Sequence, residues 1–234
     1  MRMNIEPIAT VRTCFGSKFA TPRQPGLCPS AWGELVFHPP YRNADSIRGI
    51  EGFSHLWLIF RFHETIEQGW KPTVRPPRLG GNERVGVFAS RSTFRPNGLG
   101  LSLVTLEDID TTSPDGPILK LGGIDLINGT PIYDIKPYLP YAEAIPNARA
   151  GFAHEEIPRL KVEIEENAEN DFKKLPTRAQ NLIFEALSLD PRPAVQANQQ
   201  DRTFGAMLCG KNVRFTIKEK TCLIVEIGDL TSQQ

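Results

Sequence analysis

Short runs of alternating hydrophobic and polar residues, separated by glycine and proline, fill the first 135 positions of the chain. Such alternation is typical of strands that are buried on one face, and glycine and proline mark the turns between them. We expect strands at residues 6–12, 32–37, 53–62, 85–89, 102–108, 119–126 and 130–135. Asn128 and Gly129 separate the last two, which predicts a type I′ hairpin turn with positive φ at both positions. Many short strands and weak helical signal favour a barrel or sandwich over repeating βαβ units.

The pattern changes after the sequence KPYLPY, where residues 136–146 and those that follow have the composition of a linker. Beyond it, hydrophobic residues recur first at strand spacing, then at helical spacing up to Asp190-Pro191, then again at strand spacing. This predicts a strand, a helix and two strands, at residues 161–165, 179–187, 213–217 and 222–227. The fold class expected is therefore mainly β, with a first domain at residues 1–150 and a small α+β domain at residues 157–234.

Composition restricts the function only broadly. The chain has 234 residues, 27 basic and 27 acidic side chains, and a hydrophobic fraction of 40%, which suits a soluble core. No apolar run approaches the ~20 residues of a membrane span, and residues 1–11 lack the layout of a secretory signal, so we expect a cytoplasmic protein without membrane contact. The four cysteines have no CxxC spacing, which predicts free thiols rather than a zinc ribbon or a disulfide framework.

Residues 75–100, RPPRLGGNERVGVFASRSTFRPNGLG, form a locally cationic segment. It contains five arginines, five glycines and three prolines, no lysine, and Glu83 as its one acidic residue. Arginine grips phosphate or carboxylate with two parallel hydrogen bonds and stacks on flat rings, while glycine allows a close backbone approach. We call these residues the arginine segment and expect it to bind a planar anion such as a nucleotide. A solvated loop with scattered arginines is the alternative.

The usual nucleotide and metal motifs are missing from the sequence. Residues 98–103 begin like a dinucleotide-binding glycine motif, but Leu103 replaces the third glycine and no helical pattern follows. There is no Walker loop, and neither His63-Glu64 nor His154-Glu155 has the second histidine of a zinc protease. Neither a Rossmann cofactor site nor a metal site is therefore expected.

Three further polar clusters are candidates for a site. Pro22 and Pro25 would hold Arg23 and Gln24 in a preorganised, extended presentation, unless this segment is only a rigid surface linker. Asp125, in the stretch before Asn128, would either face a ligand or merely cap a turn.

The third cluster is the strand FSHLWLIFRFHE. Its period of two places five side chains on one face: His55, Trp57, Ile59, Arg61 and His63. A satisfied, half-buried side chain explains His55 best, so we assign it no role. His63, at the strand end beside Glu64, is better placed for contact with a ligand.

Several longer strings carry a family resemblance. PRQPG, GFSHLWLIF, RPPRLGG, VGVFASRSTFRPN, DIKPYLPY and DPRP resemble the TsaA-like family and, within it, the bacterial tRNA methyltransferase branch TrmO. The resemblance implies a single-sheet β-barrel that binds S-adenosylmethionine without a Rossmann fold, a small C-terminal domain, and a homodimer. It also implies methylation of N6 of threonylcarbamoyl-adenosine, 3′ of the anticodon in threonine tRNA. Gly98-Leu99 stands where a Pro-Ile pair is common in the family, which predicts extra loop freedom without loss of a functional group.

The resemblance also implies roles for individual residues. By position, the implied cofactor contacts are Arg23, Gln24, Pro25, His63, Glu64, Arg91, Leu101, Ile124, Asp125 and Leu126. The arginines left for RNA or for the threonyl carboxylate are Arg75, Arg78, Arg84 and Arg95. The N6 lone pair of the substrate is delocalised into the purine and the carbamoyl group, so the reaction benefits from a base. Asp125 is the favoured candidate for this base and His63 the second.

Two other classes of function remain open at this point. A non-catalytic RNA-binding or nucleotide-binding regulator would use the same arginines without a pocket for a sulfonium. A hydrolase of small phosphorylated metabolites would need a metal cluster, which the sequence does not suggest.

Overall fold

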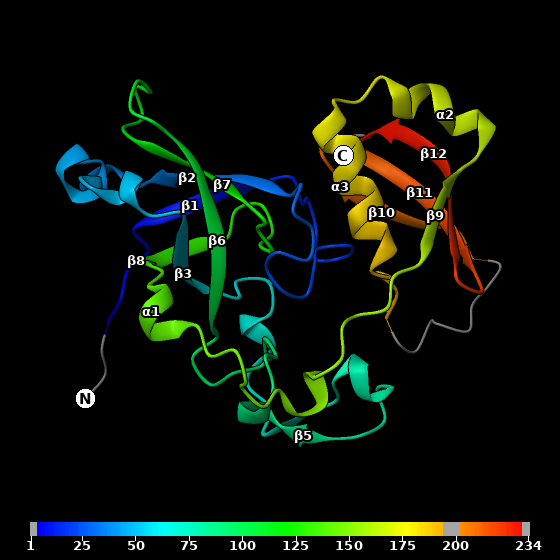
Figure 1. Cartoon of the computed structure of the whole chain (residues 1–234), viewed down its shortest axis with the longest axis horizontal. Coiled ribbons are helices and arrows are strands. Elements are labelled where there is room, and N and C mark those ends of the chain that lie inside the picture. Colours follow the sequence, from blue (N-terminus) through cyan, green and yellow to red (C-terminus); the bar gives the residue numbers. More distant parts are fainter. Residues whose placement is uncertain (1–3, 194–201, 231–234) are drawn as a thin grey trace.

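Six antiparallel strands form a closed ring in the N-terminal part of the molecule. The structure is a computed structural model that describes residues 4–193 and 202–230 (Figure 1). The strands are β1 (Ala9–Thr13), β2 (Trp32–Phe37), β3 (His55–Arg61), β6 (Leu99–Asp110), β7 (Ile118–Gly122) and β8 (Pro131–Pro137). Their order is β1-β2-β7-β6-β3-β8, and pairing of Ala9 with Ile132 and of Thr10 with Pro131 closes the ring. The prediction of a mainly β protein with some helices is confirmed.

The interior of the ring is filled by alternate residues of each strand. In β3, Leu56, Leu58 and Phe60 are buried, while the side chains between them are only partly covered. This confirms the predicted two-residue period, although the strand ends at Arg61 and leaves His63 in the turn that follows. Within β6 the same alternation buries Ser102 completely and leaves Leu101 exposed.

A smaller substructure between β3 and β6 contains most of the arginine segment. Its two-stranded sheet pairs β4 (Thr73–Val74) with β5 (Val85–Gly86), and it lies at the lower edge of the view in Figure 1. Three 3-10 helices flank the sheet: η4 (Ile66–Gln68), η5 (Pro77–Leu79) and η6 (Val87–Ala89). The remaining short helices of the N-terminal part are η1 (Pro39–Tyr41), η2 (Ala44–Ile47), η3 (Ile50–Gly52), α1 (Pro140–Glu143) and η7 (Gly151–Ala153).

The C-terminal unit, residues 157–230, packs two helices on a four-stranded sheet of order β10-β11-β12-β9. Its elements are β9 (Lys161–Ile164), α2 (Glu166–Lys173), α3 (Thr177–Ser188), β10 (Phe204–Leu208), β11 (Lys211–Lys218) and β12 (Thr221–Asp229). Helix α3 buries one apolar face, including Leu182 and Ile183, and Asp190 follows it at a φ of 47°, as the predicted helix end requires.

Three predicted elements differ from the structure. The strand expected at 119–126 ends at Gly122, because the backbone turns at Gly123, where φ is 62°. The strand expected at 85–89 stops after two residues and continues as η6. The expected linker at 136–146 contains the end of β8 and helix α1, which begins at Pro140, a residue well suited to a first helical turn.

The predicted type I′ hairpin at Asn128-Gly129 is wrong. Strand β7 pairs with β2 and β6, whereas β8 pairs with β1 and β3, so the two strands are not hairpin partners. Gly129 has a φ of 84°, but Asn128 is not at positive φ, as a type I′ turn would require. The turn instead lies in an irregular loop, residues 123–130, that crosses between the two strands.

The pattern of apolar and polar residues did not reveal two elements of the C-terminal unit, helix α2 and strand β10. Helix α2 is mostly polar, with Ala168 and Phe172 as its buried residues, and β10 contains a glycine that weakens the strand signal.

Gly98 is held in a turn, where its N–H donates to the Arg95 carbonyl (3.0 Å) and its carbonyl accepts from Phe62 N–H (2.8 Å). These hydrogen bonds tie Gly98 to its neighbours, and the expected extra freedom of this loop stays a prediction.

The ring and the C-terminal unit share one hydrophobic core cluster, which includes residues from Ala9 in β1 to Ile227 in β12. Backbone contacts join them as well, since Gly16 N–H donates to Met207 O (3.1 Å) and Cys209 N–H donates to Cys14 O (2.8 Å). All four cysteines are free thiols. Within the described ranges, none of the helices combines the length and hydrophobicity needed to cross a membrane.

Candidate active site

Asp125 lies in the loop that follows β7, next to the fully buried Ser102 of β6. The Ser102 hydroxyl donates a hydrogen bond to Asp125 Oδ1 at 2.5 Å. Burial raises the pKa of Asp125 to about 6, although the hydrogen bond from Ser102 and the positive charge of Arg91 both favour the carboxylate and limit the rise. Asp125 is therefore a partly buried carboxylate that is mostly ionised at neutral pH and is a stronger base than an ordinary aspartate.

The loop around Asp125 is anchored on both sides. Gly123 N–H donates to Ala31 O (2.9 Å), and the Thr13 hydroxyl donates to Leu126 O (2.9 Å). The side chains of Ile124 and Leu126 are buried in the core cluster. Ile124 and Leu126, both predicted cofactor residues, can therefore offer a ligand their backbone but not their side chains.

Arg91 connects the arginine segment with the loop that contains Arg23, Gln24 and Pro25. Arg91 Nη1 donates to Gln24 Oε1 at 2.5 Å, and the charge of Arg91 acts on Asp125. The same loop is tied to the loop after β7, since Gly26 N–H donates to Gly123 O at 2.8 Å. The structure therefore brings together residues that lie as far apart in the sequence as Gly26 and Gly123.

Arg23 lies in the same loop, and its side chain is exposed at the surface. Even so, the surrounding protein partly desolvates the guanidinium and lowers the pKa of Arg23, while the charge of Asp190 opposes this effect. Asp190 is in turn held by Arg192, whose Nε donates to Asp190 Oδ1 (2.9 Å) and whose Nη2 donates to Oδ2 (2.8 Å). An acidic group of the C-terminal unit thus acts on a predicted cofactor residue.

Other predicted residues lie outside this network of contacts. His63 and Glu64 occupy the turn after β3, and no side-chain hydrogen bond of either residue occurs among the described residues. Leu101 is 55% exposed and lies in a groove with Trp57 and Ile59. Because neighbouring residues of a strand face opposite sides, Leu101 points away from the side of β6 that presents Ser102 to Asp125.

Three of the four arginines predicted for RNA also have partners within the protein. Arg78 donates to the carbonyls of Ala153 and Glu155, and Arg84 Nη1 donates to Thr73 Oγ1 at 3.0 Å. Arg95 Nη1 donates to Ser90 O at 2.8 Å. Each guanidinium has five N–H donors, so these contacts leave donors for a ligand. Arg75 has no such partner among the residues that the structure describes.

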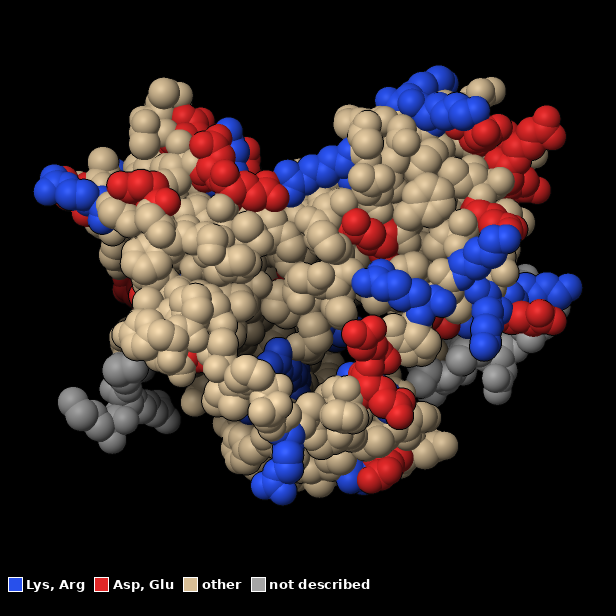
Figure 2. Space-filling view, in the orientation of Figure 1, with Lys and Arg blue, Asp and Glu red and all other residues tan. Residues whose placement is uncertain are grey.

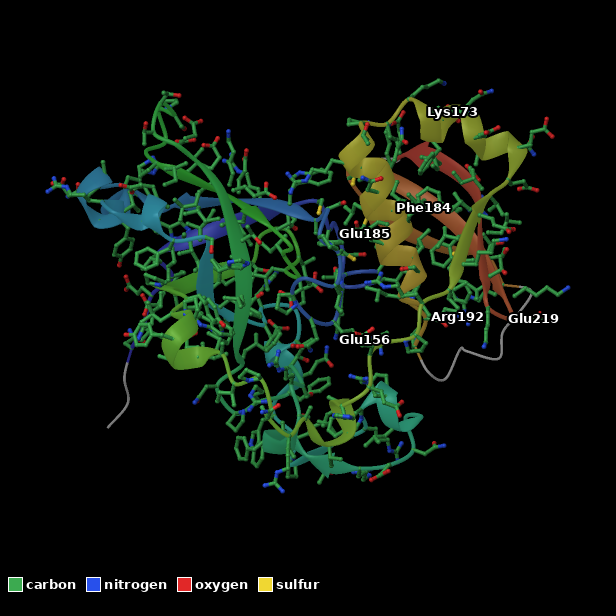
Figure 3. The ribbon with its side chains drawn as sticks, in the orientation of Figure 1. Glu156, Lys173, Phe184, Glu185, Arg192 and Glu219 are labelled. Atoms are coloured by element: carbon green, nitrogen blue, oxygen red, sulfur yellow. The ribbon has the colours of Figure 1, made fainter. Side chains whose placement is uncertain are left out.

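Contacts from the C-terminal unit to the loop of Arg23 and Gln24 were not foreseen from the sequence. Glu185 of α3, labelled in Figure 3, accepts hydrogen bonds from the backbone N–H and the hydroxyl of Ser30. Arg159 Nη2 donates to Leu27 O at 2.7 Å, and Arg178 Nε donates to Ser30 O at 3.0 Å. Neither Glu185 nor Arg159 belongs to a motif, and only the fold reveals their function of supporting this loop.

Figure 2 shows a hollow between the ring, the arginine segment and the C-terminal unit, with both basic and acidic side chains at its edge. The described residues contain no group of three or more histidine, cysteine or acidic side chains suited to a metal ion. The arrangement thus offers a partly buried base, arginine donors and close-packed glycine loops. These are the groups needed to bind an anionic, planar ligand and to accept a proton.

Comparison with known proteins gives a consistent result for both parts of the chain. Residues 10–144 match the model of the tRNA-methyltransferase O N-terminal domain, and residues 157–230 match the TrmO C-terminal domain. The chain is 48% identical over 219 residues to the tRNA (adenine(37)-N6)-methyltransferase of Escherichia coli (strain K12), covering 92% of this chain and 93% of that protein.

Two further matches come from Pseudomonas aeruginosa. One is a putative S-adenosylmethionine-dependent methyltransferase, RcsF, 43% identical over 92% of this chain and 93% of that protein. The other is a crystal structure of TrmO, with a TM-score of 0.80 and 35% identity over 97% of this chain and 99% of that chain.

Proposed function

The chain belongs to the TrmO family of tRNA methyltransferases, and from this membership and the contacts of Asp125 we infer that it methylates N6 of adenosine 37 in tRNA with S-adenosylmethionine. The observation that carries this inference is the match of both family models to one chain, which together cover most of its length. The contacts among Gln24, Arg91, Asp125 and Ser102 supply the chemistry that the reaction needs.

The residues of the site fit S-adenosylmethionine. That molecule combines a carboxylate, an ammonium group, ribose hydroxyls, an adenine ring and a sulfonium. Arg23 and Arg91 are suited to the carboxylate, Gln24 is suited to the polar edges, and Asp125 is suited to a hydroxyl or a positive charge. The backbone of residues 124–126 provides further donors and acceptors beside them. When bound, S-adenosylmethionine supplies a methyl group on an electrophilic sulfur.

We propose that Asp125 accepts the N6 proton of the substrate as the methyl group is transferred. Ser102 fixes the orientation of the carboxylate through its 2.5 Å hydrogen bond, and this bond, together with the charge of Arg91, opposes the rise in pKa that burial causes, so that the carboxylate is mostly ionised at neutral pH. The loops on either side, anchored by the hydrogen bonds to Ala31 and Thr13, hold the reacting groups in place. His63 is the second candidate for the base, from its place in the turn after β3.

We propose that the adenosine is threonylcarbamoyl-adenosine in threonine tRNA. Its threonyl carboxylate and the phosphates of the anticodon loop are the anionic groups that an arginine-rich, lysine-poor surface recognises. Arg75, Arg78, Arg84 and Arg95 are assigned to these groups, and Arg23, Gln24, Pro25, His63, Glu64 and Arg91 to the cofactor. A protein of zero net charge can still bind RNA, because binding depends on the local patch.

Four finer features follow from the same proposal. The ring serves as the S-adenosylmethionine-binding β-barrel, residues 1–150 and 157–234 are two domains, and the protein acts in the cytoplasm as a homodimer. The apolar groove of Trp57, Ile59 and Leu101 offers a surface for the second copy. In such a dimer, Leu101 would serve the site of the other copy, which reconciles its outward direction with a cofactor contact.

The decisive experiment combines purified protein, labelled S-adenosylmethionine and threonine tRNA from cells that lack this gene product. We expect label in the tRNA and a methylated threonylcarbamoyl-adenosine by mass spectrometry. Threonine tRNA without the threonylcarbamoyl group is the control, and equal methylation of both would overturn the substrate assignment. Binding of tRNA without any transfer of label would favour the alternative of a non-catalytic RNA-binding regulator.

A further inference from the structure

Phe88 presents an unusually exposed aromatic ring within the arginine segment. Its relative exposure is 75%; Tyr141 at 88% and Ile145 at 70% are comparably exposed, but both lie outside the arginine segment. With so much of its surface in water, the ring adds little to the hydrophobic core of the folded chain. Its position in a cationic segment suggests a ligand that is both flat and negatively charged.

The backbone beneath Phe88 is held firmly. Val87 N–H donates to Pro72 O (3.0 Å), and the Ser90 hydroxyl donates to Val87 O (2.9 Å). Arg95 Nη1 donates to Ser90 O, and its guanidinium lies over the Phe88 ring with 5.8 Å between Cζ and the ring centroid. The ring is thus presented in a defined position, with a positive charge on one of its faces and most of its surface open.

Phe88 also lies close to the candidate active site. It precedes Arg91 by three residues, so their Cα atoms are separated by at most about 11 Å. Arg91 in turn contacts Gln24 and acts on Asp125. Phe88 thus shares a short segment with the arginine that acts on Asp125, and a nucleotide next to the one that reacts at Asp125 is the candidate partner of the ring.

We propose that Phe88 stacks on an unpaired base of the anticodon loop beside the methylated adenosine, an inference that rests on the proposed function. Proteins that read single-stranded loops commonly splay bases out and stack them on aromatic side chains and arginine planes. Phe88 offers the ring, and Arg95 adds a cation for the adjacent phosphate or base. This gives the arginine segment a base-binding position as well as phosphate contacts.

The test is the Phe88→Ala variant, assayed for methyl transfer at a series of tRNA concentrations. Loss of one base stack is expected to raise the KM for tRNA between about 5-fold and about 150-fold. The affinity for S-adenosylmethionine and kcat at saturating tRNA should stay within twofold of the wild type. The Phe88→Trp variant, which keeps a stacking surface, should restore a KM near that of the wild type.

Tyr41→Ala is the matched control, because Tyr41 is an exposed aromatic residue on η1, in a part of the chain remote from β5 (Figure 1). An unchanged KM for tRNA in Phe88→Ala would overturn the proposal. The proposal would also be overturned if the molecular mass of Phe88→Ala in solution were half that of the wild type, since that result would assign the ring to an interface between copies of the chain. Absence of methyl transfer by the wild type would instead reject the proposed function, and direct tRNA binding by Phe88→Ala would still test the stacking.

Discussion

Glu185 accepts two hydrogen bonds from Ser30, one from the backbone N–H to Oε2 at 2.9 Å and one from the hydroxyl to Oε1 at 2.8 Å. The two residues belong to different parts of the molecule, since Glu185 lies on α3 and Ser30 ends the loop of Arg23 and Gln24. Arg159 and Arg178 hold the carbonyls of the same loop. The C-terminal unit thus supports the loop assigned to the cofactor without contributing its central residues.

Replacing Glu185 by alanine should therefore weaken cofactor binding from a distance. We expect the Kd for S-adenosylmethionine, measured by calorimetry, to rise roughly tenfold, because hydrogen bonds to a charged group contribute about 1.5–3 kcal/mol and only part of this reaches the loop. Glu185→Gln keeps an acceptor for the Ser30 N–H and should recover much of the affinity.

Glu226→Ala is the control for Glu185→Ala, because Glu226 pairs with Arg214 on the exposed face of the same unit. Equal cofactor affinity in Glu185→Ala and Glu226→Ala would mean that the loop does not depend on the C-terminal unit. If Glu185→Ala lowered the melting temperature without changing the Kd for S-adenosylmethionine, the contact with Ser30 would be purely structural.

The arginine segment should separate into residues that serve RNA and one that serves the cofactor. Arg75→Ala is expected to raise the KM for tRNA and to flatten its salt dependence, with little change in cofactor affinity, because a lost phosphate contact reduces the salt slope by about one. Arg91→Ala should weaken the affinity for S-adenosylmethionine and leave the KM for tRNA and its salt dependence nearly unchanged, since it removes the partner of Gln24 and the positive charge near Asp125.

Arg75 is the cleanest position for this comparison. Arg78 and Arg95 also hold backbone carbonyls, so alanine there would disturb the segment as well as the RNA contact. Titration of salt from low to physiological concentration in the methylation assay provides the measurement. A cofactor defect in Arg75→Ala that matched the defect in Arg91→Ala would contradict the division of roles.

Sequence reasoning predicted the strands best where one face of the strand is buried. Residues 32–37 were predicted without error, and the face predicted for His55, Trp57 and Ile59 is the less buried face of β3, because the two-residue period records burial directly. The loop at 123–130 was mistaken for strand and hairpin, since Ile124 and Leu126 alternate like a strand but are buried by side-chain packing across a backbone turn.

The candidate site was only partly accessible from the sequence. Gln24, Arg91 and Asp125 belong to recognisable motifs, and the structure brings them together. Ser102 lies in a strand, and the residues around it in the sequence do not predict that its hydroxyl donates a hydrogen bond to Asp125. Such contacts depend on the pairing order of the ring, which places β6 beside β7 and which no local pattern encodes.

The pH dependence of the reaction should report Asp125. If this carboxylate is the base, kcat/KM rises with pH and levels off above its pKa of about 6. Asp125→Asn should lower activity by more than tenfold and remove this rise. His63→Gln should retain the rise if His63 is not the base. A pH-dependent rise that persists in Asp125→Asn and disappears in His63→Gln would transfer the role to His63.

Asp125 should also leave a signature on stability that does not depend on catalysis. Burial raises its pKa in the folded state from 3.8 to about 6, so between these values the folded chain binds a proton that the unfolded chain has lost. The free energy of unfolding must then fall as pH rises through this window, by about 3 kcal/mol at most, and stay level above it. Asp125→Asn has no such proton, and its stability relative to the wild type should increase from pH 4 to pH 7. Denaturant unfolding of both proteins at several pH values measures the difference, and a constant difference over this range would show that the carboxylate is not buried as the structure describes.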